Sequence, residues 1–127
     1  MYEHDAFSQW LGIELIEIAP GKAVVRLQVR KEMLNGHGIA HGAITYALAD
    51  SAFAFAVNSQ GRKAVSIETS IAHLALVKAD TIITAVAEEE NLTHKIGIYT
   101  IRIHDDSNKQ VALFRGTAYR SSESWEV

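Results

Sequence analysis

The sequence predicts an α+β fold in which an antiparallel sheet of about six strands wraps around one long central helix. One alanine-rich apolar segment spans residues 43–57, and alanine is the strongest helix former. Shorter segments on both sides of it show the period-two alternation of strands. No strand–helix–strand repeat occurs, which argues against a parallel dinucleotide-binding sheet. One helix surrounded by antiparallel strands is the simplest arrangement that buries the apolar segment.

The chain has 127 residues, a length typical of one compact domain, and we expect a single domain over residues 1–127. Its 12 Lys and Arg against 15 Asp and Glu give a net charge of −3. Binding of nucleic acid usually relies on an excess of basic residues, and this chain has none. No nucleic-acid partner is therefore expected. The absence of cysteine excludes disulfides, thiolate metal sites and cysteine nucleophiles.

Targeting signals are not expected from this sequence. The first residues are neither basic nor followed by an apolar run, unlike a signal peptide. The longest apolar stretch, 43–57, is shorter than the roughly 20 residues that span a bilayer, and it contains Asp50. We therefore expect a cytoplasmic protein with no membrane contact.

The first third of the chain predicts a short helix and two strands. The helix covers 5–11 and ends at Gly12. Strands follow at 13–18 and 23–29, joined by a Pro-Gly turn. In the second strand one face is better suited to burial, and its residues are Val25, Leu27 and Val29.

The remainder predicts the central helix and four more strands. The segment 43–57 is apolar all round, which indicates a buried helix. In the strand after it, Val65, Ile67, Thr69 and Ile71 are expected to share one face. The tail is expected to fray. The four strands are expected at 64–72, 81–88, 95–104 and 110–119, a turn at 105–108, and the tail at 121–127.

Asp50 is the sharpest candidate for chemistry. It is the only charged residue in 43–57, and burying an unpaired carboxylate costs several kcal/mol. One interpretation is a structural carboxylate that pairs with a cation or caps a loop. The other is a catalytic base or nucleophile.

The loop before the central helix is the second candidate. Residues 35–42 contain three glycines and two histidines. The first amides of a helix lack an internal acceptor and lie at its positive end. Gly42 is therefore a candidate oxyanion donor, and a glycine-rich entry turn without a ligand is the alternative.

The histidines do not predict a metal site. His37 and His41 are four residues apart, but the glycines around them oppose a helix there and the glutamate of the metalloprotease pattern is absent. No metal and no cofactor are expected. The remaining histidines are interpreted as surface or strand residues: His4, His73, His94 and His104.

The spacing of the two candidates predicts shared sites. Gly42 and Asp50 are eight residues apart on one helix, which is roughly 12 Å. An oxyanion donor and the group that attacks the same carbonyl must lie much closer. If both residues are catalytic, Asp50 must come from a second subunit, and a two-fold dimer with two identical sites is expected.

Several segments resemble the hotdog-fold acyl-CoA thioesterases, and most closely their PaaI type, which acts in phenylacetic acid degradation. The resemblance covers nearly the whole chain. The segments that carry it are Leu34-Asn35-Gly36-His37, His41-Gly42-Ala43, Leu48-Ala49-Asp50 through residue 61, and Val111-Ala112-Leu113-Phe114-Arg115-Gly116.

The resemblance implies a hotdog fold, homodimers that commonly assemble into homotetramers, and hydrolysis of an acyl-CoA thioester at the dimer interface. It implies that Asp50 is the nucleophile or general base and that Gly42 provides the oxyanion-hole amide. Asn35 would lie near the thioester and the attacking water, and His41 would support the loop. Ser66 stands where a related subgroup carries a water-positioning hydroxyl.

The chain departs from the family pattern twice. Ala43 replaces the usual second glycine, and the donor amide of Gly42 is expected to survive this change. Residues 74–77 stand where an Arg-Pro pair is common, which leaves specificity open. CoA carries phosphates, so basic residues are expected near the entrance, and the candidates are Arg62, Lys63, Lys95 and Arg115.

Two other functions remain open for the sequence. A hydratase or dehydratase of the same fold would use a histidine with a carboxylate, but the proline-rich loop of those enzymes is absent here. A non-catalytic acyl-CoA sensor would bind without turnover, and binding alone does not require Asp50. An aryl-acyl-CoA thioesterase is the function we expect.

Overall fold

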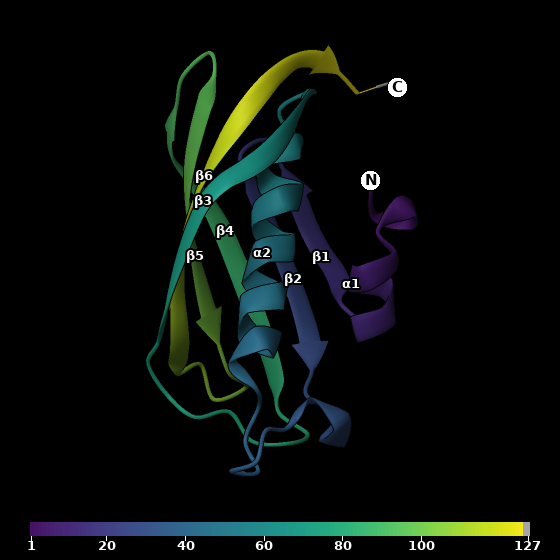
Figure 1. Cartoon of the computed structure of the whole chain (residues 1–127), viewed down its shortest axis with the longest axis vertical. Helices are drawn as coiled ribbons and strands as arrows, with labels where there is room; N and C mark the ends of the chain where they lie inside the picture. The colour runs from purple at the N-terminus through teal and green to yellow at the C-terminus, as the bar shows by residue number, and fades with distance from the viewer. Residues whose placement is uncertain (126–127) are drawn as a thin grey trace.

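The computed structural model describes residues 1–125 and shows one six-stranded antiparallel sheet with a long helix along one face (Figure 1). The strand order is β1-β2-β4-β5-β6-β3. The elements are η1 (Tyr2–His4), α1 (Ala6–Leu11), β1 (Glu14–Ala19), β2 (Lys22–Gln28), η2 (Lys31–Met33), α2 (Gly42–Asn58), β3 (Arg62–His73), β4 (Ile82–Leu92), β5 (Ile96–His104) and β6 (Gln110–Ser124).

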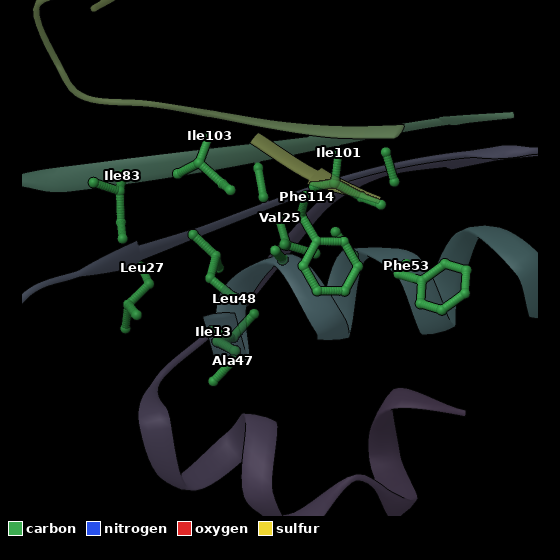
Figure 2. Close-up of a cluster of buried hydrophobic side chains, with 14 of the residues drawn as sticks. Ile13, Val25, Leu27, Ala47, Leu48, Phe53, Ile83, Ile101, Ile103 and Phe114 are labelled. Carbon is green, nitrogen blue, oxygen red and sulfur yellow. The ribbon is translucent and has the colours of Figure 1, made fainter. Parts of the chain in front are cut away.

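The core lies between the sheet and α2, as predicted from the apolar helix. Val25 and Leu27 of β2, and Val29 just after it, are each at most 1% exposed, which confirms the predicted buried face. Figure 2 shows β-sheet side chains meeting those of α2, with α1 on the opposite side of the helix. Burial of each large apolar side chain contributes about 1.5–3 kcal/mol.

Gly116 sets how closely α2 approaches the sheet. A Cβ at this position would lie 2.6 Å from a ring carbon of Phe53, a distance that real side chains do not adopt. The Phe53 ring therefore packs directly against the backbone of β6, and the glycine permits that contact.

The C-terminal segment differs from the prediction of a frayed tail. Residues 121–124 belong to β6, and Arg62 pairs with Ser124. The Trp125 indole nitrogen donates to the side-chain oxygen of Asn58 at 3.1 Å. Pairing with β3, which is distant in sequence, orders this segment. The last two residues of the predicted tail, 126–127, lie outside the described residues.

A β-bulge changes which residues of β3 face the helix. Ser66 pairs with Ala118 and Glu68 pairs with Thr117, so Ile67 is an extra residue. Ala118 is fully buried, and directly paired residues point to the same side of a sheet. Ser66 therefore faces the helix side. Without the bulge, strict alternation would turn it away.

The bulge makes the predicted face of β3 wrong. Thr69 and Ile71 face α2, but Val65 and Ile67 are 63% and 59% exposed. The extra residue shifts the alternation by one position between Ser66 and Thr69. This shift depends on pairing with β6 and leaves no signal in local periodicity.

β3 and β1 are the two edges of the sheet. An edge strand presents unpaired amide and carbonyl groups, which form a template for another strand. The exposed Val65 and Ile67 add apolar surface to the β3 edge. No helix in residues 1–125 is both long enough and apolar enough to cross a membrane.

Candidate active site

His41 caps the start of α2. Its backbone is extended, and its Nδ1 accepts the amide of Ala43 at 3.0 Å. An imidazole nitrogen that accepts a hydrogen bond carries no proton, so the neutral ring has its hydrogen on Nε2. The cap takes the amide of Ala43. No hydrogen bond within residues 1–125 uses the Gly42 amide as donor, and this amide lies at the positive end of the helix.

Asn35 organises the loop in front of that helix end. Its Oδ1 accepts the amides of His37 at 2.9 Å and Ile39 at 3.4 Å. The backbone amide of Asn35 donates to the carbonyl of Ile39 at 2.8 Å. These contacts form an Asx-type turn. They occupy the side-chain oxygen and leave the Nδ2 donors available to a ligand.

Gly42 lines a small cavity of about 170 Å³ together with other polar residues. Asn35, Gly42, Thr45 and His73 contribute the polar part of its lining. Ala75, Leu76 and Val77, from the segment that departs from the family pattern, form much of the apolar part. Two larger hollows of about 380 and 510 Å³ include N-terminal residues and Trp125, and the first also includes residues of β1 and of the end of α2. Neither contains a predicted catalytic residue.

His73 belongs to this cavity, although its position in the sequence predicted only a surface or strand residue. Thr45 Oγ1 donates to the carbonyl of Gly42 at 3.1 Å and lies 3.2 Å from His73 Nδ1. With its one hydrogen used, Thr45 accepts from Nδ1. A Cβ on Gly42 would lie 3.3 Å from His73 Nε2. The period-two spacing of Thr69, Ile71 and His73 is the signal that could have placed it here.

Asp50 is half-buried in the middle of α2 and has no ion-pair or hydrogen-bond partner within residues 1–125. One chain therefore provides no support for a structural ion pair. Burial raises the pKa of the Asp50 carboxyl above its ordinary value of 3.8, and the nearby negative charge of Asp5 raises it further. Both causes favour a carboxyl with more basic character than an exposed aspartate.

Contacts on either side place Asp50 beside β3. Tyr46, one turn earlier on the same stripe of α2, lies 2.6 Å from Thr69 through their hydroxyl oxygens. Near the end of α2, Asn58 donates to the carbonyl of Ala64 at 3.2 Å. The helix and the strand thus run antiparallel, and Asp50 lies between these two contacts along α2.

The predicted residues form two separate groups in one chain. Asn35, His41 and Gly42 gather at the start of α2, Asp50 lies near its middle, and Ser66 lies on the side of β3 that faces the helix. Eight residues of helix separate Gly42 from Asp50, which is about 12 Å. Within one chain, Gly42 and Asp50 are therefore too far apart to act on the same carbonyl. No group of three or more potential metal ligands occurs in residues 1–125.

The four basic candidates do not form one patch. The Arg62 guanidinium donates to the carbonyl of His94 in the β4–β5 turn, next to Lys95. Lys63 forms an ion pair with Glu123 at 3.0 Å. Arg115 pairs with Thr100 and Ser70 on the face of the sheet away from α2.

Comparisons with known proteins identify the family of this chain. The thioesterase superfamily matches residues 37–112. The acyl-coenzyme A thioesterase PaaI of Escherichia coli (strain K12) is 43% identical over 120 residues, which cover 94% of this chain and 86% of that protein.

Solved structures of similar proteins share the fold. The E. coli PaaI protein from the phenylacetic acid degradation operon has a TM-score of 0.96 and 42% identity, over 98% of this chain and 90% of that one. A mutant of the phenylacetic acid degradation protein PaaI from Thermus thermophilus has a TM-score of 0.89 and 40% identity, over 92% and 100% of the two chains.

Proposed function

Because this chain belongs to the thioesterase superfamily, with the hotdog fold expected from its motifs, we propose that it is an acyl-CoA thioesterase. It hydrolyses an arylacyl-CoA, such as phenylacetyl-CoA or hydroxyphenylacetyl-CoA, to the free acid and CoA. The similarity to PaaI proteins of phenylacetic acid degradation supports the aryl substrate.

One observation carries this proposal: the Gly42 amide has no acceptor within residues 1–125, and Gly42 lines a cavity together with other polar residues. A thioester carbonyl oxygen placed there would receive a backbone donor at a helix N-terminus. Such a donor is worth about 2.7–4 kcal/mol in the transition state. Asn35 lines the same cavity, and its side-chain donors would hold the thioester or the water.

Asp50 performs the attack in this proposal, either by removing a proton from water or as the nucleophile itself. Its raised pKa supports either role, because a general base works best when its pKa approaches the working pH. Ser66, turned toward the helix side by the bulge at Ile67, would position the water. His41 would hold the loop through its cap on Ala43.

The functional unit is a homodimer in which each site combines Gly42 of one chain with Asp50 of the other. The open β3 edge supports this arrangement, since two such edges can pair antiparallel about a two-fold axis. Helix α2 runs antiparallel to β3. Pairing of the edges would bring the start of one α2 toward the middle of the other.

Further assembly and CoA binding complete the proposal. Dimers would associate into a homotetramer, and exposed Trp10 and Ile18 offer apolar surface outside β3. The CoA phosphates would bind basic residues at the entrance. Among the candidates, Lys95 and Arg115 take part in no ion pair within residues 1–125.

The test is thiol release from a panel of acyl-CoA esters, followed with a thiol reagent. We expect release of CoA, fastest with arylacetyl substrates and slower with straight-chain acyl groups. Binding of the same esters without release would overturn hydrolysis and indicate a sensor. Equal rates across the panel would overturn the aryl preference and leave the thioesterase activity standing.

A further inference from the structure

A buried hydrogen-bond chain fixes a second carboxylate against the helix that carries Asp50. Ser51, the residue after Asp50, lies 2.8 Å from Ser8 through their hydroxyl oxygens. Ser8 Oγ donates to Asp5 Oδ2 at 2.7 Å. With its hydrogen used there, Ser8 accepts from Ser51. The two serines are 8% and 1% exposed, so the chain is protected from water.

The same carboxylate caps α1, because Asp5 Oδ1 accepts the amide of Ser8 at 3.0 Å. A cap needs only this bond. The serine-to-serine contact does more, since it joins α1 to α2 at the residue next to Asp50. Two hydrogen bonds therefore link the carboxylate of Asp5 to the side chain of Ser51, the residue that follows Asp50.

The charges around Asp50 make this placement significant. After burial, the negative charge of Asp5 is the second cause that raises the pKa of the Asp50 carboxyl. On the β3 side, Ser66 and Thr69 present hydroxyls, and Glu68 pairs with Thr117 on the opposite face. In the proposed dimer, the second copy would also bring its His41 and His73 to this site.

We propose that Asp5 is a positioning residue for the catalytic carboxylate: fixed on α2 through Ser8 and Ser51, its negative charge makes Asp50 a stronger base. The inference rests on the proposed function, because it assigns Asp5 a role in that same site. An isolated aspartate with a pKa near 3.8 is a weak base toward water, and a neighbouring negative charge raises its proton affinity.

The substitution Asp5→Asn removes the charge and keeps a side chain that caps helices as well as aspartate does. Glu3→Gln is the matched control, because it removes one negative charge from an exposed residue of the same segment. We expect the acid limb of the kcat/KM pH profile to move to lower pH in Asp5→Asn. Glu3→Gln should leave the acid limb in place. Any effect of the second copy's histidines on the profile is the same in both variants.

Direct titration of Asp50 makes the test independent of turnover. The carboxyl carbon of Asp50, labelled with ¹³C, is followed by NMR from pH 3 to 9 in the full-length wild type and in both variants. We expect a lower midpoint in Asp5→Asn alone, and this result stands even if no acyl-CoA is hydrolysed. Equal midpoints in the wild type and Asp5→Asn would overturn the proposal. If Asp5→Asn does not fold, Asp5→Ser, another good cap, answers the same question.

Discussion

The Nδ1 atom of His41 accepts the amide of Ala43 at 3.0 Å, and this bond passes over Gly42. The helix is capped one residue beyond the amide that the proposed chemistry needs. As a result, α2 gains the stability of a cap, while its first amide has no acceptor within residues 1–125. The same residue thus stabilises the helix start and leaves a donor for a substrate oxygen.

Gly42→Pro tests that donor directly. Proline lacks an amide hydrogen and is well tolerated at the first position of a helix, and His41 already has the extended backbone that precedes proline. Gly42→Ala is the control, because it adds a Cβ toward His73 but keeps the amide. We expect Gly42→Pro to be about 10²–10³-fold below Gly42→Ala in kcat. Equal activity of the two folded variants would exclude the amide from catalysis.

Asp50→Asn keeps the shape of the side chain and removes the base. We expect kcat to fall by at least about 10²-fold, the low end of general-base contributions. Asp106→Asn, at an exposed turn position, is the control and should retain wild-type turnover. Near-normal turnover in a folded Asp50→Asn variant would remove Asp50 from the mechanism.

The raised pKa of Asp50 also predicts a stability effect. The folded state holds this proton to higher pH than the unfolded state, so ionisation of Asp50 lowers the free energy of unfolding as pH rises above about 3.8. Asp50→Asn should therefore have the higher Tm above the folded-state pKa, and this gain should disappear below the ordinary pKa. Thermal unfolding across the pH range measures it. A constant Tm difference at every pH would contradict the account.

Ser66→Ala tests the consequence of the bulge at Ile67. Ser66 faces the helix side, while Ser70 pairs with Arg115 on the other face. Loss of one hydrogen bond to the attacking water should lower kcat on the order of 10-fold. Ser70→Ala should leave kcat unchanged. If both variants turn over alike, the hydroxyl of Ser66 does not position the water.

Local patterns predicted the features that depend on neighbours in sequence. Apolar character identified α2, alternation identified β2, and the isolation of one charge identified Asp50. The position of Gly42 followed from the glycine-rich loop and the start of the helix. These features need only propensity, periodicity and the chemistry of helix ends.

Pairing between distant segments determined the features that were not predicted. Ile67 bulges because of its register with β6, and residues 121–124 are ordered because β3 lies beside them. His73 reaches the cavity because β3 ends next to Gly42. The contact between Asp5, Ser8 and Ser51 likewise requires α1 to pack on α2.

The central claim is that each site takes Gly42 from one chain and Asp50 from another, and subunit complementation tests it most directly. Equal amounts of inactive Asp50→Asn and Gly42→Pro chains are mixed, and mass spectrometry confirms exchange. Random pairing makes half of the dimers mixed, each with one intact site, so about a quarter of wild-type kcat should return if sites act independently. No recovery of activity despite confirmed exchange would contradict the shared site. It would indicate that Gly42 and Asp50 of the same chain act together.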